Sequence, residues 1–511
     1  MPQTTVNPII PGFAPDPSVV LIDDIFFLVN STFHMFPGLP IYASKDLISW
    51  KQIGNAINRR AQLSLRLSDT SLVPLEDLGE VMLATGGLYA PTIRQHNGIV
   101  YVVCTNVIHN EGSTKDVTEN FIVSTHDIWS DEWSDPVYFE FQGIDPSLFF
   151  DQDGKAYIHG SAAPGPMTKI HLFEIDLATG KKLSEEKKIW DGTGGIYPEG
   201  PHIYKRDDWY YLLISEGGTH GDHMITAARS TDIWGPYEEY ERNPILTAKG
   251  TDEYIQYTGH SDVFQDQKGE WWGVCLGVRK DQGKRFIMGR ETFLTHGSWP
   301  VGQWPSLDRV KSDPTTLSRT PSPQHITSKS NVDYLYIRDV DLSLYVYDDS
   351  KGTIKLTTTN VDLSHPTDSP TFVGKRQRQL DGASSVSLGL EAQTLGYQAG
   401  LAVYKDEHRY IRIFYDSSKK AVMAEKKNKA KELHQVIRSE LLDPVGVIEF
   451  QIAYAETEYR LSYRGTGAWN QVMHLDTLEM TDPDFVGPVV GIFAVGSSGS
   501  VEVEFSALKI D

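Results

Sequence analysis

Cysteine is nearly absent from this sequence, since Cys104 and Cys275 are the two thiols among 511 residues. Two cysteines are too few for a disulfide framework or for a thiolate metal site. Long hydrophobic runs are also missing, because no stretch approaches the roughly 20 apolar residues that span a bilayer. The opening segment MPQTTVNPII has neither the basic nor the apolar part of a secretion signal. We therefore expect a cytoplasmic protein, with a processed secreted form as the alternative.

Positive charge is scarce as well. Lys and Arg together number 47 against 68 Asp and Glu, which leaves a formal net charge of −21. Nucleic acids and anionic membranes are bound through Lys and Arg, so this excess of negative charge argues against both as partners. We expect a neutral or cationic partner instead, and a homo-oligomer stays open.

Aromatic residues and glycine, by contrast, are abundant. Aromatics make up 11% of the chain, which also has 43 glycines. Turn signals recur at short intervals and helical periodicity is rare until late in the chain, which indicates β structure. The length allows two or three domains, each large enough to bury its own core.

One short pattern occurs five times in the first three hundred residues: a polar turn followed by an aromatic residue in a short apolar strand. The copies are DIFF (24–27), GIVY (98–101), GKAY (154–157), DWYY (208–211) and GEWW (269–272). Another short strand precedes each copy. A unit of several short strands that recurs at this spacing is typical of a β-propeller blade. The five units predict a five-bladed β-propeller over residues 1–305, and a β-sandwich with accidental aromatic turns is the alternative.

The register shared by the five repeats brings acidic residues together. In a propeller the first strand of each blade lines the central axis, so equivalent positions of the blades face one another. We take these positions to be Asp16, Ala90, Asp145, Glu199 and His260. Three acids then converge from three blades. Because like charges held close cost free energy, a purely structural ring would avoid them.

Three carboxylates, without a nucleophilic Ser or Cys and without a phosphate-binding loop, predict glycoside hydrolysis. One carboxyl must be protonated to give its proton to the leaving oxygen, and another must be ionised to activate water or to attack. A third anion nearby raises the pKa of the acid and orients it. The sequence supplies all three groups.

The segments around these acids resemble those of glycoside hydrolase family 43, the five-bladed propeller β-xylosidases and α-L-arabinofuranosidases. The matching segments are NPIIPGFAPDPSVV (7–20), FPGLPIYASKDLISW (36–50), GGLYAPTIRQHNGIVYVV (86–103), GIDPSLFFDQDGKAYI (143–158), YPEGPHIYKRDDWYYLLISEGGT (197–219), TGHSDVFQD (258–266), WWGVCLGVR (271–279) and GRETF (289–293). The resemblance implies that Asp16 is the general base, that Glu199 is the general acid, and that Asp145 tunes and orients Glu199. It also implies inversion of the anomeric centre, which requires base and acid carboxyls about 6.5–9.5 Å apart.

The same resemblance implies further site residues. Arg279 matches an arginine that hydrogen-bonds sugar hydroxyls, and a surface cation is its alternative. His260 matches a histidine associated with a calcium ion or a water cluster. We favour a structural role for His260, because calcium prefers several oxygen ligands, and a structural calcium ion is the alternative. We expect that no cofactor is required. Phe33 and Phe36 resemble aromatics of the pocket wall, with core packing as the alternative.

The border of the pocket is where the chain departs from the family. Tyr89 stands where xylosidases of this family often have Trp, and the segment 66–84 is a longer insertion beside it. His223 and Glu216 lie in matching segments, so they are candidates for supporting contacts, His223 for the substrate. The preferred sugar is therefore left undetermined by the resemblance.

A second domain follows a linker. Between residues 306 and 332 the composition shifts to Pro, Ser, Thr and Lys. Over residues 333–511, strands with period-two alternation predict an antiparallel two-sheet sandwich of jelly-roll type. They resemble the C-terminal sandwich of xylosidase-type members, which closes one side of the pocket. Phe485 is the candidate from this domain for the active site; a core position for Phe485 and a free-standing carbohydrate-binding module are the alternatives.

These features favour an inverting exo-glycosidase that removes terminal β-1,4-xylose or α-L-arabinofuranose from neutral xylan or arabinoxylan oligosaccharides. A predominant α-L-arabinofuranosidase is one alternative. A non-catalytic, lectin-like propeller is another, and it predicts the loss of at least one of the three acids. A fructoside hydrolase on a related fold would carry a nucleophile in an Asn-Asp-Pro-Asn context, where this chain has Ala14-Pro15-Asp16-Pro17-Ser18.

Overall fold

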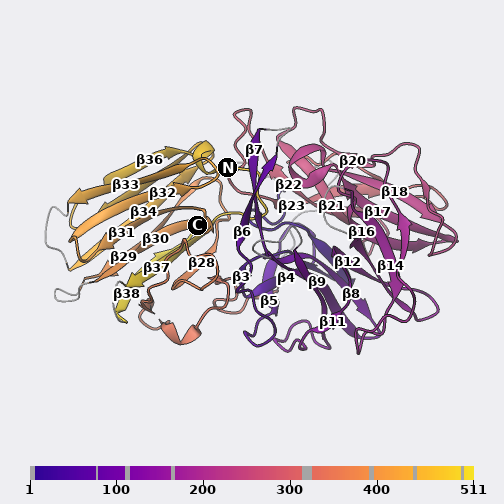
Figure 1. The fold of residues 1–511 in the computed structure, drawn as a ribbon, viewed down its shortest axis with the longest axis horizontal. Helices are drawn as coiled ribbons and strands as arrows, with labels where there is room; N and C mark the ends of the chain where they lie inside the picture. The colour runs from indigo at the N-terminus through magenta and orange to yellow at the C-terminus, as the bar shows by residue number, and fades with distance from the viewer. Residues whose placement is uncertain are drawn as a thin grey trace.

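The structure, a computed structural model, describes residues 6–75, 79–109, 116–162, 167–312, 325–390, 396–440, 446–496 and 500–511. Two β-rich domains lie side by side, the first in indigo to magenta and the second in orange to yellow (Figure 1). The helices of the described residues are the short turns η1 (Gly218–Asp222), η2 (Leu342–Leu344) and η3 (Thr477–Met480). None of these helices is long and apolar enough to cross a membrane. The all-β prediction is confirmed.

Five antiparallel sheets form the N-terminal domain. The first contains β1 (Ser18–Ile22), β2 (Ile25–Val29), β4 (Gly38–Ser44) and β5 (Lys51–Ile57), and the second β8 (Gly87–His96), β9 (Ile99–Ile108), β10 (Val117–Thr125) and β11 (Val137–Phe139). The third contains β12 (Gly143–Phe150), β13 (Ala156–Ala162), β14 (Lys169–Glu174) and β15 (Lys187–Trp190). The fourth contains β16 (Glu199–Arg206), β17 (Trp209–Glu216), β18 (Met224–Ser230), β19 (Glu238–Glu239) and β20 (Leu246–Thr247), and the fifth β21 (Ile255–Gln265), β22 (Trp271–Arg279), β23 (Glu291–Ser298) and β24 (Ser306–Leu307).

The five sheets are arranged in a ring. Each innermost strand contacts the next, in the order β1, β8, β12, β16, β21 and back to β1. The N-terminal segment joins the ends of the ring: Ile10 pairs with Thr292 of β23, and the amide of Asn7 donates to the carbonyl of Leu294 at 2.8 Å. The predicted five-bladed propeller is confirmed.

The repeated turn-plus-aromatic pattern corresponds to the hairpin between the first and second strands of each blade. Residues with left-handed φ occupy all five turns, as is typical of tight hairpins. They include Asp24 (64°), Gly98 (77°), Gly154 (85°), Asp207 (53°) and Gly269 (82°). The aromatic residue that follows then lies in the second strand, where it packs between neighbouring blades.

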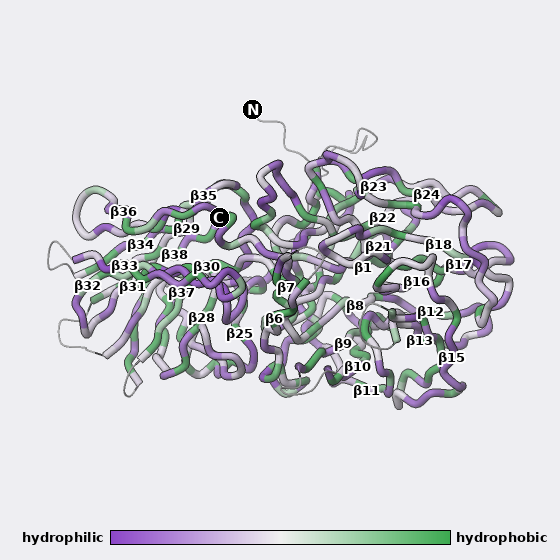
Figure 2. Tube along the Cα trace, turned by 45° about the horizontal axis from the view of Figure 1, so that its top comes forward, coloured by the Kyte–Doolittle hydropathy of each residue, from purple (hydrophilic) through white to green (hydrophobic). Residues whose placement is uncertain are grey.

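The C-terminal domain is a sandwich of two antiparallel sheets, as predicted. One has the strand order β26 (Tyr345–Asp348), β27 (Thr353–Thr357), β38 (Glu502–Lys509), β29 (Gly382–Gly389), β34 (Val447–Ala455), β35 (Glu458–Arg464) and β36 (Asn470–Asp476). The other has the order β28 (Phe372–Arg376), β37 (Val489–Gly496), β30 (Tyr397–Asp406), β31 (Arg409–Asp416), β32 (Ala421–Asn428) and β33 (Leu433–Glu440). Hydrophobic and hydrophilic residues are interspersed along these strands (Figure 2), and in the first sheet buried residues alternate with more exposed ones, as in β34. In the second sheet, β30, β31 and β37 are buried along almost their whole length.

The two domains are joined by backbone pairing as well as by side chains. Strand β3 (Met35–Phe36) of the propeller pairs with β25 (Tyr336–Ile337) of the C-terminal part. A hairpin of β6 (Thr70–Leu75) and β7 (Glu80–Thr85) lies near the junction, where Leu83 pairs with Asp484 (Figure 1). The insertion predicted at 66–84 therefore reaches the second domain, although residues 76–78 lie outside the described chain.

The segment predicted as a linker, 306–332, begins inside the propeller. Its first residues form β24, which pairs with β23 as the outer strand of the fifth blade. Residues 313–324 of this segment lie outside the described chain. The fifth blade thus extends past residue 305, where the sequence predicts that the propeller ends.

Candidate active site

One backbone feature recurs at a matched point of each blade, and it presents two of the three acids, Asp16 and Asp145. The innermost strands β8, β12, β16 and β21 each shift register relative to their partner strand at one matched point. At this point the backbone adopts a left-handed φ, which turns the side chain out of the strand toward the channel mouth. The residues concerned are Asp16 (53°), Ala90 (39°), Asp145 (55°), Gly200 (54°) and His260 (48°).

Glu199 does not share this position, which corrects the predicted register by one residue. Gly200 occupies the matched site in the fourth blade, and Glu199 precedes it, where Tyr89 stands in the second blade. A Cβ atom at Gly200 would lie 2.8 Å from Nδ1 of His260, so a side chain there would collide with the imidazole. The acid of this blade therefore comes from the neighbouring residue.

Asp16 is fixed by two side chains. Ser31 donates its hydroxyl to Oδ2 at 2.6 Å, and Arg290 donates Nη1 to Oδ1 at 3.2 Å. The turn before Asp16 is held by Asn30, whose amide donates to the carbonyls of Ala14 and Pro15. These contacts hold the buried carboxyl group of Asp16 in one orientation.

Asp145 is a buried carboxyl group with a raised pKa. Burial raises its pKa well above the usual range, and the negative charges of Glu199 and Asp16 raise it further. The amide of Gly200 donates to Oδ2 of Asp145 at 2.9 Å. Asp145 thus holds the residue next to Glu199 and repels the charge on Glu199.

Glu199 is the most accessible of the three acids. Its side chain is 19% exposed, against 6% for that of Asp16. Nε2 of His223 lies 3.5 Å from Oε1 of Glu199, and Nδ1 of His223 lies 3.3 Å from the carbonyl of Tyr257. A side chain at Gly259 would occupy the place of the His223 ring, because its Cβ would lie 2.3 Å from that ring.

Glu216, the other predicted supporting residue, is buried below the loop that leads to Glu199. It accepts hydrogen bonds from the hydroxyls of Thr193, at 2.9 Å, and Thr226, at 2.6 Å. The amide of Gly195 donates to it as well, at 3.2 Å. Glu216 therefore fixes the loop.

Three predicted aromatic residues meet beside the carboxylates. The ring of Phe33 lies 4.8 Å from that of Tyr89 and 5.9 Å from that of Phe485, measured between centroids. Phe33 itself is only 1% exposed, whereas Tyr89 and Phe485 are partly exposed. Tyr89 and Phe485 therefore form the accessible wall, and Phe33 supports it from behind. Phe485 comes from the second domain, so both domains build the site.

Phe36 is not part of this wall. It is 5% exposed and lies in β3, which pairs with Tyr336 of the second domain. Its ring belongs to a hydrophobic core cluster that also contains Leu39 and Leu88. The alternative of core packing is the one that the structure shows.

Arg290, rather than Arg279, is the arginine beside the acids. Arg279 forms a bidentate ion pair with Glu291, at 2.7 and 2.8 Å. Arg290 contacts Asp16 and also donates Nη2 to the carbonyl of Phe485 at 3.0 Å. Arg290 was not predicted from the sequence as a site residue, although it lies in the segment GRETF, one of the segments that match the family.

His260 lies near Asp16 but not within a calcium-type ligand shell. Nδ1 of His260 is 3.9 Å from Oδ1 of Asp16, whose oxygens already accept from Arg290 and Ser31. Among the described residues, no group of three or more His, Cys, Asp or Glu side chains is placed to hold a metal ion. Calcium takes six to eight oxygen ligands, and the described carboxylates near His260 do not supply such a set by themselves.

The channel below the acids is filled by a polar network drawn from all five blades. Arg94 pairs with Asp262 at 2.8 Å and contacts Nδ1 of His202 at 3.1 Å. Ser18 donates to Asp262, and Ser147 contacts His202. Burial acts to raise the pKa of Asp262, but Arg94 outweighs it and holds that pKa below the usual range. This network connects the innermost strands of all five blades across the channel.

Comparisons with known proteins cover nearly the whole chain. Residues 5–305 match the family model of glycosyl hydrolases family 43, and residues 327–510 match that of the beta xylosidase C-terminal Concanavalin A-like domain. A non-reducing end alpha-L-arabinofuranosidase of Bacteroides ovatus is 32% identical over 97% of this chain and 92% of its own. A xylosidase/arabinosidase of Butyrivibrio fibrisolvens is 35% identical over 80% of this chain and 79% of its own.

A solved structure extends the similarity to both domains. The xylan beta-1,4-xylosidase from Bacillus halodurans superimposes with a TM-score of 0.86 at 25% identity, over 99% of this chain and 100% of that one. The arrangement of propeller and sandwich is therefore shared along the full length.

Proposed function

Because the chain belongs to glycosyl hydrolases family 43, we propose that it is an inverting exo-glycosidase that releases terminal pentose residues from xylan or arabinoxylan oligosaccharides. The observation that carries the proposal is the set of three carboxyl groups in three different environments at one channel mouth. Asp16 is paired with a guanidinium, Asp145 is buried with a raised pKa, and Glu199 is partly exposed. The two relatives named above are an arabinofuranosidase and a xylosidase/arabinosidase, which supports a pentose as the sugar released.

Asp16 is the general base of the proposed reaction. Its carboxylate is held in one orientation by Ser31 and Arg290, so it can accept a proton from a water molecule as that water attacks the anomeric carbon. Direct attack of water inverts the anomeric configuration and leaves no covalent intermediate.

Glu199 is the general acid, since its greater exposure lets it reach the leaving oxygen. Asp145 acts through Glu199: the charge of Glu199 contributes to the raised pKa of Asp145, so the two carboxyl groups interact, and the amide of Gly200 donates to Asp145, which fixes the backbone beside Glu199. The proton that leaves water on one side of the sugar is balanced by the proton given to the leaving group on the other. No step is assigned to a metal ion or cofactor.

Exo action follows from the wall that the second domain supplies. Phe485 and Tyr89 offer partly exposed aromatic faces, 5.7 Å apart between centroids. Such faces pack against the C–H faces of sugars, and burying an aromatic ring is worth about 1–3 kcal/mol. With the channel crossed by Arg94 and Asp262 and one side closed by Phe485, the site accepts a chain end.

A predominant α-L-arabinofuranosidase is the second candidate, favoured by the name of the Bacteroides ovatus relative. The two candidates are separated by kcat/KM on an aryl β-xyloside and on the matching aryl α-L-arabinofuranoside. If kcat/KM on the xyloside divided by kcat/KM on the arabinofuranoside exceeds one, the enzyme is primarily a β-xylosidase. If this quotient is below one, it is primarily an α-L-arabinofuranosidase. Failure to hydrolyse either would refute the proposed activity and leave the lectin-like alternative.

A further inference from the structure

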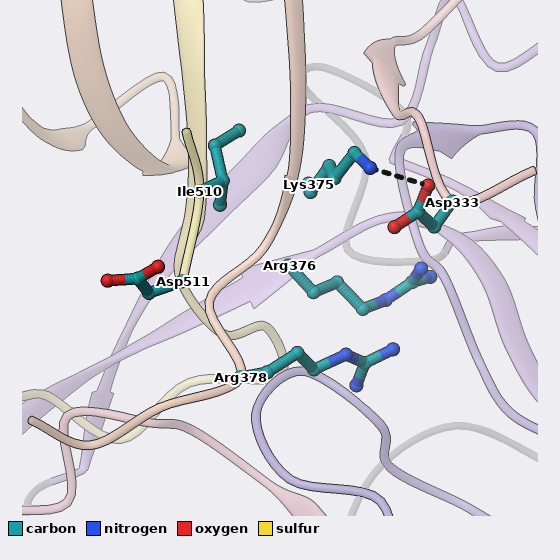
Figure 3. A pocket seen from close by; sticks show the side chains of 6 residues that line it. All are labelled: Asp333, Lys375, Arg376, Arg378, Ile510 and Asp511. Atoms are coloured by element: carbon teal, nitrogen blue, oxygen red, sulfur yellow. Dashed lines mark ion pairs between the residues drawn. The ribbon is translucent and has the colours of Figure 1, made fainter. Parts of the chain in front are cut away.

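The cations at the junction of the two domains are engaged within the protein. Lys375 forms an ion pair with Asp333 at 3.0 Å (Figure 3). Arg378, beside it, donates to the carbonyl of Pro11 and to the hydroxyl of Tyr42, both in the propeller. The cavity that these cations line is therefore explained by the contact between the domains. Two side chains at the mouth of the catalytic channel are not explained in this way.

The loop 192–198 carries these two side chains and leads directly into Glu199. Its backbone is fixed at both ends. Glu216 holds the first part through hydrogen bonds from backbone amides, the shortest at 3.0 Å. At the other end, the carbonyl of Pro198 accepts from the hydroxyl of Ser161 at 2.6 Å. The loop therefore has a defined position beside the proposed general acid.

Ile196 and Tyr197 are the large side chains that this loop presents to the outside. Ile196 is 47% exposed, and Tyr197 is partly exposed. Tyr197 also has a left-handed φ of 53°, which is sterically costly for a residue with a bulky side chain. Backbone strain of this kind is concentrated at functional sites. The conformation of Tyr197 therefore points to a functional role for its side chain.

Both side chains lie against Gly218, on the active-site side of the loop. A Cβ atom at Gly218 would be 3.3 Å from Cδ2 of Tyr197 and 4.0 Å from Cδ1 of Ile196. The next residue, Thr219, accepts a hydrogen bond at 3.3 Å from Arg290, the arginine of the active site. Tyr197 and Ile196 are therefore at the mouth of the catalytic channel.

Within the mouth, Tyr197 is on the side of Glu199. Burial raises the pKa of Tyr197, and the negative charge of Glu199 raises it further, so the two groups interact. A general acid must lie within hydrogen-bond reach of the leaving oxygen, about 2.6–3.2 Å. The sugar that departs with that oxygen therefore occupies the space next to Glu199, where Tyr197 and Ile196 are the exposed side chains of the loop.

We propose that Tyr197, with Ile196 beside it, contacts the sugar on the leaving side of the scissile bond. The ring of Tyr197 packs against the C–H face of this neutral sugar, and Ile196 extends the apolar surface. The inference rests on the proposed exo-glycosidase activity and adds to it the contact that recognises the second sugar of the substrate. Tyr89 and Phe485 keep their role beside the terminal sugar.

A disaccharide and a glycosyl fluoride of the preferred terminal sugar separate this contact from catalysis. The disaccharide places a sugar against Tyr197, whereas fluoride is too small a leaving group to reach it. Tyr197→Asn removes the ring and keeps a residue type that tolerates left-handed φ. We expect kcat/KM of this variant to fall about 10-fold or more on the disaccharide and to stay within about threefold on the fluoride. Equal losses on both substrates, or no loss on the disaccharide, would overturn the inference.

Two further variants define the contact. Tyr197→Phe keeps the ring and should hold kcat/KM on the disaccharide within about threefold of wild type. A loss as large as that of Tyr197→Asn would overturn packing of the ring as the contact. Tyr138→Asn, at an exposed tyrosine in the outer strand of the second blade, is the matched control and should leave both substrates unaffected.

Ile196→Ser serves if Tyr197→Asn does not fold. It should lower kcat/KM on the disaccharide about threefold or more relative to the fluoride, and equal effects on the two substrates would overturn the inference. A wild-type enzyme that cleaves neither substrate would refute the proposed activity and this contact together. Cleavage of both by the wild type, with equal losses in the variants, would refute the contact alone.

Discussion

The guanidinium of Arg290 donates a hydrogen bond to the main-chain carbonyl of Phe485 at 3.0 Å. Arg290 belongs to the propeller and Phe485 to the sandwich, and the other terminal nitrogen of Arg290 contacts Asp16. A single side chain therefore connects the proposed general base with the loop that closes the site. The second domain is part of the catalytic unit in this account.

Replacement of Arg290 by Lys should lower kcat/KM by about 10- to 100-fold. Hydrogen bonds to charged groups contribute roughly 1.5–3 kcal/mol, and Lys cannot reach Asp16 and Phe485 at once. Steady-state kinetics on the better aryl glycoside measures the effect. Arg279→Lys is the control and should keep kcat/KM within about threefold, because Arg279 is bound to Glu291 instead. A larger loss in Arg279→Lys than in Arg290→Lys would contradict the assignment.

Replacement of Glu199 by Ala should affect poor leaving groups most. A general acid contributes about 100- to 10,000-fold when the leaving oxygen needs a proton, and little when the aryl oxide is already stable. The measurement is kcat/KM along a series of aryl glycosides of decreasing leaving-group pKa. Glu238→Ala, at an exposed position of the same blade, should follow the wild-type dependence. An equal loss across the whole series in Glu199→Ala would remove Glu199 from the acid role.

Replacement of Asp145 by Asn should raise the stability and lower the activity at neutral pH. The pKa of Asp145 is raised in the folded protein, chiefly by burial, so the folded state binds the proton more tightly than the unfolded state does. Ionisation of Asp145 therefore destabilises the fold as the pH rises above the ordinary Asp value of about 3.9. The Tm of the variant minus that of the wild type should increase from pH 4 to pH 7, while kcat falls. A difference that decreases over this range would contradict the raised pKa.

Asp484→Ala should loosen the loop that carries Phe485. The Asp484 carboxylate forms ion pairs with Lys405 at 2.5 Å and with Arg409 at 2.6 Å, and all three side chains are buried. Removing it takes the carboxylate from the buried ammonium of Lys405, whereas Arg409 keeps its ion pairs with Asp406 and Asp482. Breaking one buried ion pair costs roughly 3–5 kcal/mol in the free energy of unfolding. We expect a lower Tm together with a raised KM, because the wall of the sugar pocket is displaced. Glu502→Ala, whose partner Lys355 is exposed, is the control and should change neither value appreciably. An unchanged Tm in Asp484→Ala would show that the cluster does not hold the loop.

Much of the fold was predictable because local sequence patterns indicate its strands and turns. Five tight turns, each followed by an aromatic residue, predicted the five blades, and period-two alternation predicted the sandwich. The two aspartates of the site were predictable for the same reason, since Asp16 and Asp145 each precede a proline at the matched bend.

The rest depends on contacts between distant segments. The shift of Glu199 by one residue follows from the approach of His260 to Gly200, which no local pattern reports. Arg279 and Arg290 both belong to the fifth blade. Arg279 forms an ion pair with Glu291, and Arg290 is the arginine that contacts Asp16. Phe36 was assigned to the pocket wall, but the pairing of β3 with β25 places it at the domain junction.

The stereochemistry of the first product tests the central claim most directly. Proton NMR can follow an aryl β-xyloside, or the matching arabinofuranoside, from the first minutes of hydrolysis, before mutarotation. With Asp16 as general base for a water molecule, the xyloside should yield α-xylose first, and Asp16→Ala should yield no product above about one thousandth of the wild-type rate. Initial release of β-xylose would show a retaining mechanism and would contradict the account of Asp16, Asp145 and Glu199 given above.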